Sequence, residues 1–176
     1  IISKDLLRSE LEANSILSCI NREAKTVADM YDINDIAPYA EVSAISVAEI
    51  IDLRTVTEVK DLLNETIKPC SWVWSQIAVC LQADTRDQKR LQYLVYLQYL
   101  INFFGLTNTE LRKFREIGGT IGGAPDFVVS RLLRRFTDRQ VDGGYTSNKM
   151  TAKLKDTLLA TILVLTSLLN NFSVDV

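Results

Sequence analysis

The chain has 176 residues, of which 47% are hydrophobic and 24% are charged, and its formal net charge is −2. This composition allows a packed core and argues against a wholly disordered chain, while the net charge alone favours no particular partner. The sequence has no histidine and three separated cysteines, Cys19, Cys70 and Cys80, which excludes an ordinary zinc cluster or a disulfide framework. We expect buried thiols in a reducing compartment.

The first segment, from Ser3 to about Met30, is predicted to be a helix. Ser3 can cap it, and apolar residues recur along one side. From Ile1 to Thr66 there are 13 acidic and 6 basic residues, a net charge of −7. The chain begins at Ile1 without a signal-peptide pattern, and we expect it to be part of a longer protein.

The segment from Tyr31 to Tyr39 is predicted to be a loop, in which Pro38 keeps Ala37 out of the helical region. Short helices are predicted at about Val47 to Leu53 and at about Thr57 to Leu63. This part of the chain is therefore expected to be a helical linker rather than a catalytic region.

The next segment contains two predicted helices separated by a polar boundary. The first is Ser71 to Leu81, where Trp72 and Trp74 are expected to be core or interface anchors rather than a stacking platform. Gln82 to Gln88 is polar and charged. The second helix, Lys89 to Phe104, is apolar on most of its circumference and should be covered by neighbours.

Gly105 is expected to end that helix, and a short helix is predicted from Thr109 to Glu116. The segment from Gly118 to Gly123 holds four glycines. A glycine-rich loop before a helix can bind phosphate, but no strand precedes this one and no Lys-Ser/Thr pair follows it. We interpret it as a flexible connector.

A helix with an arginine-rich side is predicted after Pro125, which is expected at the first helical position. Apolar residues recur at helical spacing and arginines fill much of the opposite side: Phe127, Val128, Leu132 and Leu133 against Arg131, Arg134 and Arg135. From Arg131 to Lys155 there are 7 basic and 2 acidic residues, a net charge of +5. This side of the molecule could meet a polyanion, whereas the acidic N-terminal third could not.

A β-hairpin is predicted directly after this helix. A short strand follows Phe136, the turn is at Asp142-Gly143-Gly144, and the second strand starts at Tyr145. An Asp-Gly pair between two short runs is a good hairpin signal. An arginine-rich helix followed at once by a hairpin is typical of a winged helix.

The last predicted helix runs from Met150 to Phe172. Its apolar run from Leu158 to Leu169 is too short to span a bilayer, so we expect a buried core helix. The predicted fold class is mainly α with a small β-hairpin, in which a winged helix is preceded by a helical linker. We divide the chain into residues 1–88, a helical linker and docking segment, and residues 89–176, a first winged-helix domain.

No pairing of a nucleophile with a base can be proposed, because histidine is absent and the cysteines lack a partner. No two carboxylates are marked as convergent either. We therefore expect a protein that is not an enzyme and that binds no cofactor, metal, small-molecule ligand or membrane.

The chain resembles the C-terminal half of the forty-nine-kilodalton-class subunit of RNA polymerase I. The resemblance covers Leu91 to Val176, about half of the chain. It is carried by LQYLVYLQYLINFF (Leu91 to Phe104), Pro125 with Val128-Val129, LLxRFT (Leu132 to Thr137) and the closing Asn171-Phe172-x-Val174. Upstream, Asp32 to Tyr39 is similar in character to the linker of that family.

The resemblance implies a subunit that joins a TFIIF-like dimerisation domain to a tandem winged-helix region akin to TFIIE. That region binds double-stranded DNA near the polymerase cleft and supports initiation and elongation on ribosomal RNA genes, in the nucleus and nucleolus. The implied partners are other RNA polymerase I subunits, including a TFIIF-like dimerisation partner. We expect this chain to hold the linker and the first winged helix, without the dimerisation domain or the second winged helix.

Seven basic residues are the candidates for contact with DNA phosphates, and Arg135, which lies in the family signature, is the first of them. The set is Arg131, Arg134, Arg135, Arg139, Lys149, Lys153 and Lys155. Such contacts give salt-dependent binding that is largely independent of sequence. A solvated face is the structural alternative for this group.

Two other functions stay open. The chain could be a protein–protein docking module within a transcription complex, with no direct DNA contact and with its acidic third lying over a basic surface. It could also be an unrelated all-α adaptor, which would require Thr137 to Ser147 to be helical or disordered rather than a hairpin.

Overall fold

The computed structural model describes residues 21–25, 27–83 and 86–171. Most of the helix predicted from Ser3 lies outside these residues. Residues 21–25 form turns and a bend, so that helix does not continue unbroken to its predicted end, and only Val27–Met30 (α2) is helical there.

The described residues fold into helices and one two-stranded antiparallel sheet, which confirms the predicted fold class. The linker helices are α3 (Ile33–Ile36), α4 (Tyr39–Val42), α5 (Ala48–Ile51), α6 (Val56–Glu65) and α7 (Ser71–Gln82). The remaining elements are α8 (Gln88–Phe104), α9 (Asn108–Leu111), α10 (Phe114–Thr120), α11 (Asp126–Phe136), β1 (Asp138–Asp142), β2 (Tyr145–Lys149) and α12 (Ala152–Asn171).

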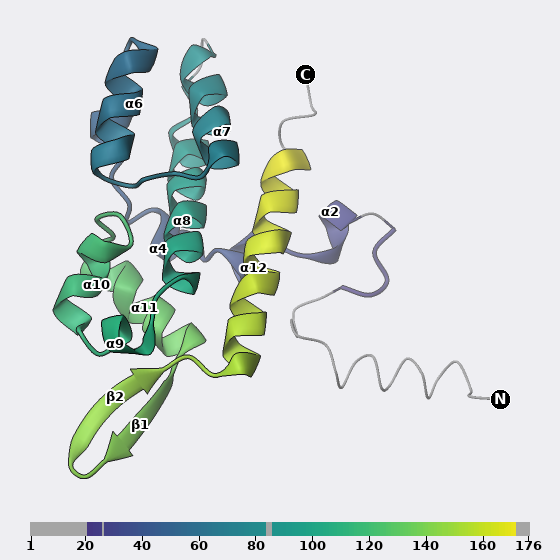
Figure 1. Ribbon diagram of the computed structural model, residues 1–176. Helices are drawn as coiled ribbons and strands as arrows, with labels where there is room; N and C mark the ends of the chain where they lie inside the picture. Colours follow the sequence, from purple (N-terminus) through teal and green to yellow (C-terminus); the bar gives the residue numbers. More distant parts are fainter. Residues whose placement is uncertain (1–20, 26, 84–85, 172–176) are drawn as a thin grey trace.

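Helix α8 lies at the centre of the fold, with α7 and α12 packed against it (Figure 1). Asp87 begins the helix by accepting a hydrogen bond from the backbone N–H of Arg90 at 3.1 Å. Every residue of α8 from Leu91 to Leu100 is buried, as its all-round apolar sequence predicts. The helix ends at Gly105, which is the C-cap but keeps a right-handed φ of −80°.

Polar side chains of α8 bind the linker rather than water. Gln92 donates to the carbonyl of Ile45 at 2.8 Å, and the Gln98 side-chain oxygen accepts from the N–H of Cys70 at 2.8 Å. Both glutamines are buried, so these bonds offset the cost of removing their amides from water. One hydrophobic core therefore contains residues from both sides of the predicted boundary at 88/89, and the division into a docking segment and a winged-helix domain stays a prediction.

The predictions for the linker hold in part. Trp72 and Trp74 are partly buried against the core, as anchors should be, and Ala37 before Pro38 has a non-helical φ of −130° and ψ of 88°. The predicted loop from Tyr31 is wrong in one respect, because it contains α3, which begins where Asp32 accepts a hydrogen bond from the N–H of Asn34. This local cap was hidden in a segment rich in turn residues.

The thiols are placed nearly as expected. Cys80 is buried and Cys70 is half-buried, both unpaired, while Cys19 lies outside the described residues. Burial raises the pKa of the Cys80 thiol, which makes it a poor nucleophile.

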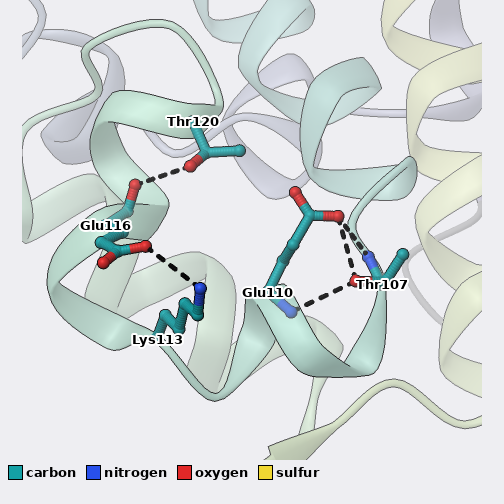
Figure 2. A network of polar contacts seen from close by, with 5 residues as sticks. All are labelled: Thr107, Glu110, Lys113, Glu116 and Thr120. Atoms are coloured by element: carbon teal, nitrogen blue, oxygen red, sulfur yellow. Dashed lines mark hydrogen bonds and ion pairs between the residues drawn. The ribbon is translucent and has the colours of Figure 1, made fainter.

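The single helix predicted from Thr109 to Glu116 is in fact two helices, α9 and α10. Figure 2 shows the reason: Thr107 and Glu110 form a capping box that begins α9, and a second start follows at Lys113. The Lys113 Nζ and Glu116 carboxylate lie 3.8 Å apart in the new turn (Figure 2). Two helix N-termini within eight residues thus separate α9 from α10, whereas periodicity alone predicts one continuous helix.

The glycine-rich segment is not a flexible connector. Gly118 lies inside α10, and a Cβ there would come within 2.8 Å of the Ala124 carbonyl oxygen. Gly122 has a φ of +120°, and a Cβ there would lie 3.0 Å from the Ile67 Cα. These two glycines allow backbone segments to touch where any side chain would separate them.

Helix α12 is only partly the buried helix that its apolar run predicts. Leu158, Leu165 and Leu169 are buried against the core, whereas Leu159 and Leu163 are 41% and 59% exposed. The helix therefore has one face in the core and one that the described residues leave uncovered.

A buried carboxylate and a buried phenol join α4 to α8. Tyr96 is fully buried and its hydroxyl donates to the Glu41 carboxylate at 2.6 Å, while Glu41 itself is 6% exposed. Burial first, and then the neighbouring carboxylate, raise the pKa of Tyr96 far above its ordinary value. The folded state therefore holds this phenolic proton tightly and keeps the donor in place.

We expect Tyr96→Phe to lower the free energy of unfolding by about 1–3 kcal/mol, because it leaves the buried Glu41 carboxylate without its donor. Urea unfolding of the whole chain measures the change. Tyr145→Phe removes the same hydroxyl from a side chain that is 82% exposed and should have almost no effect. Equal stabilities for the two variants would contradict the account of this pair.

Candidate nucleic-acid interface

Helix α11 has one buried side and one exposed side. Pro125 was predicted at the first helical position but is the N-cap, so that the helix begins at Asp126. The buried side consists of Val128, Val129, Leu132, Leu133 and Phe136. Phe127 was predicted on the apolar side but is 42% exposed, because the true buried stripe is rotated toward Val129. The exposed stripe contains Phe127, Ser130, Arg131 and Arg134.

Two arginines lie together on that exposed stripe. The Arg131 guanidinium lies over the ring of Phe127, 5.1 Å from its centroid, so that the exposed ring helps to position the cation. Arg134 follows in the last turn, where a positive charge is favoured by the helix dipole. Among the described residues, no carboxylate lies within ion-pair distance of either arginine.

Arg135 has a different environment from the other two. Its guanidinium donates to the Ile36 carbonyl at 2.7 Å and to the Asp35 carbonyl at 3.3 Å, and it lies over the Phe136 ring at 4.9 Å. The side chain is half-buried between α11 and the end of α3. With its donors directed at backbone carbonyls, Arg135 is placed to hold the linker against α11.

The β-hairpin protrudes from the body of the molecule, beside the start of α12 (Figure 1). In its register Asp138 lies opposite Lys149 and Arg139 lies opposite Asn148. Because successive residues of a strand point to opposite faces, Arg139 and Lys149 lie on different faces of the hairpin. Of these two cations, Lys149 has the acidic Asp138 directly opposite it, whereas Arg139 has the neutral Asn148.

The two lysines at the start of α12 also diverge. Lys153 and Lys155 are two positions apart, which places them on different sides of a helix. The Lys155 ammonium lies over the ring of Phe104 at the end of α8, 4.9 Å from its centroid. Lys153 is exposed, with no such ring contact among the described residues.

The seven predicted residues therefore do not form one surface. The structure brings Arg131 and Arg134 together, gives Arg135 contacts inside the fold, and distributes the hairpin and α12 cations over several faces. Prediction from sequence missed three exposed apolar side chains nearby: Phe127, Val141 (75% exposed) and Tyr145 (82% exposed). A hairpin of five-residue strands with nothing to cover it is the signal that could have identified the last two.

Neither a metal-binding group nor a membrane-spanning helix is found among the described residues. None of its His, Cys, Asp and Glu side chains gather into a group of three that could hold a metal ion. None of the helices among these residues has the length and apolar character that crossing a bilayer requires.

Comparison with known proteins gives two findings. A family model described as A49-like RNA polymerase I associated factor matches residues 2–176. A protein of Schizosaccharomyces pombe named DNA-directed RNA polymerase I subunit rpa49 is 24% identical over 157 residues, which are 89% of this chain and 36% of that protein. The chain thus spans about a third of the length of this relative.

Proposed function

Because the chain belongs to the family of A49-like RNA polymerase I associated factors, we propose that it is a non-catalytic part of that polymerase which binds DNA. In this proposal α11 and the hairpin form a winged helix that lies along double-stranded DNA near the polymerase cleft. In this role residues 89–176 support initiation and elongation on ribosomal RNA genes.

The exposed side of α11 carries this proposal. Arg131 and Arg134 form a positive surface that no described carboxylate neutralises, and the protruding hairpin carries a further exposed cation, Arg139. Phosphates are the part of a duplex that such a surface meets without regard to sequence. Lys149, Lys153 and Lys155 extend the positive field, although their side chains point in different directions.

We expect this chain to bind two duplexes of unrelated sequence with similar affinity, and each affinity to fall steeply as salt is added. Fluorescence anisotropy of labelled duplexes across a salt series measures both. The physical reason is the release of condensed counterions when arginines and lysines replace them at phosphates. No binding at low salt, or a marked preference for one duplex, would contradict the proposal.

A protein-docking role is the second candidate, and the exposed apolar residues favour it. Val141 and Tyr145 on the hairpin are among the most exposed large hydrophobic side chains described, and aromatic residues of this kind often anchor protein interfaces. A docking module with no DNA contact would associate with polymerase largely independently of salt. It would also leave the labelled duplex free in the anisotropy experiment.

The family also supports a set of partners and a location. We propose that the chain assembles with other RNA polymerase I subunits in the nucleus and nucleolus. A TFIIF-like dimerisation partner is proposed as one of these subunits. In such an assembly, the acidic linker is kept from DNA by its charge and lies on protein.

A further inference from the structure

A groove runs between the end of α6 and α10, on a part of the molecule that the proposed DNA contact does not use. It consists of two adjoining cavities of about 440 and 340 Å³ that share Glu65, Thr66, Ile67 and Gly119. Both are open to solvent along one side. Together they form an extended depression rather than a closed pocket.

The two sides of the groove are fixed to each other from below. Asn102 of α8 donates to the Ile67 carbonyl at 3.1 Å and to the Ile121 carbonyl at 2.8 Å. The backbone of Gly122 also packs closely against Ile67, which is a second contact between the same two segments. The groove is therefore preformed, which lowers the entropy cost of binding something in it.

Gly119 lies where the two cavities meet. It lies inside α10, where glycine is unfavourable for a helix, and a Cβ at this position would meet nothing within 4 Å. Packing thus gives no reason for a glycine here, in contrast to Gly118 and Gly122. A longer side chain at this position would occupy the groove.

The charge of the groove is opposite to that of α11. Glu49 and Glu65 line the larger cavity, and neither carboxylate has a hydrogen bond or an ion pair among the described residues. Among the described residues, no lysine or arginine lines that cavity, and Lys68 is the one that lines the smaller cavity. A nucleic acid is thus repelled, and a cation-bearing chain is attracted.

We propose that this groove binds an extended, lysine- or arginine-bearing segment of another protein. The main chain of that segment crosses Gly119, and its basic side chains reach the carboxylates of Glu49 and Glu65. The rigid groove, the open glycine and the two carboxylates without partners support this occupant over an apolar helix or a polyanion. The inference goes beyond the DNA contact and does not depend on it.

The test is an NMR titration of the isotope-labelled whole chain with a short peptide of alternating lysine and serine. We expect the backbone amide signals of Ile67, Gly119 and Gly122 to shift. The same peptide with glutamate in place of lysine should leave them unchanged. Absence of shifts at these amides at low salt would overturn the proposal.

Two sets of variants test separately the role of the two carboxylates and the role of the open space at Gly119. Glu49→Gln with Glu65→Gln should weaken peptide binding about tenfold, since each exposed ion pair contributes modestly. Asp138→Asn with Asp156→Asn makes the same change of charge at exposed residues that line neither cavity and should leave binding nearly unchanged. Equal weakening by both pairs would mean that net charge, and not the groove, attracts the peptide, which overturns the proposal.

Gly119→Leu fills the groove without removing a charge, and it should abolish the localised shifts while Gly119→Ala reduces them only slightly. Far-UV circular dichroism checks that both variants remain folded. Full binding by a folded Gly119→Leu variant would exclude a segment crossing at this point. Titration with duplex DNA should leave the groove amides unshifted, which distinguishes a failure here from a failure of the DNA proposal.

Discussion

Arg135→Ala is expected to lower the free energy of unfolding by about 2–4 kcal/mol, whereas Arg131→Ala should change it by less than about 0.5 kcal/mol. Arg135 donates to the carbonyls of Ile36 and Asp35, and removing it leaves acceptors at the end of α3 without their donor. Among the described residues, the Arg131 guanidinium has a ring contact with the exposed Phe127 and no hydrogen bond or ion pair. Urea unfolding of both variants measures the difference.

The size of the Arg135 effect follows from the weakness of the element that it holds. Helix α3 has four residues and cannot be stable by its own hydrogen bonds. Arg135→Lys should recover only part of the loss, because an ammonium lacks the planar fork that reaches two carbonyls. If Arg135→Ala were as stable as Arg131→Ala, the contacts to α3 would contribute nothing and the structural role would be wrong.

Changing Arg131 and Arg134 together to Ala is expected to weaken binding to duplex DNA roughly tenfold to a hundredfold at low salt. Both side chains are exposed and hydrogen-bond to no other described residue, so the free energy of unfolding should stay nearly unchanged. Anisotropy with one labelled duplex gives the affinity. Arg54→Ala with Lys60→Ala is the matched control, since it removes two exposed cations from the acidic linker.

These two expectations assign different roles to neighbouring arginines. Arg134 and Arg135 are adjacent in the chain, yet one is exposed and the other is held between two helices. A substitution at Arg135 would reduce DNA binding through loss of structure, which urea unfolding would reveal. A substitution at Arg131 or Arg134 should reduce binding in a chain that is still folded.

Much of the fold could be predicted because its signals are local. The hairpin follows from the Asp142-Gly143 turn between two short runs, and α8 follows from an apolar sequence that no exposed helix could carry. The buried half of α12 follows from its run from Leu158 to Leu169. In each case neighbours in sequence determine the outcome.

The rest depends on contacts between distant segments. The carbonyls that Arg135 binds lie about a hundred residues earlier in the chain, so its sequence neighbours contain no signal of that role. The prediction of a flexible connector failed at Gly122 for the same reason, because its packing partner is the distant Ile67. Glu41 and Tyr96 likewise become a buried pair only when α4 meets α8.

The candidate site was predicted as a region but not as a surface. Composition located the basic segment from Arg131 to Lys155, and periodicity located its helix. Neither could show that Arg139 and Lys149 lie on opposite faces of the hairpin, or that Phe127 lies beneath Arg131 on the exposed side. The direction of these side chains depends on the strand register and the helix phase, which composition and periodicity do not fix to the residue.

The salt dependence of DNA binding tests the central claim most directly. We would plot the logarithm of the binding constant against the logarithm of salt concentration for the unchanged chain, for the Arg131→Ala, Arg134→Ala variant and for the Arg54→Ala, Lys60→Ala control. The account predicts a steep slope that becomes shallower by about two in the α11 variant, one for each lost phosphate contact, and that is unchanged in the control. Equal slopes in all three proteins would show that the exposed side of α11 does not contact DNA.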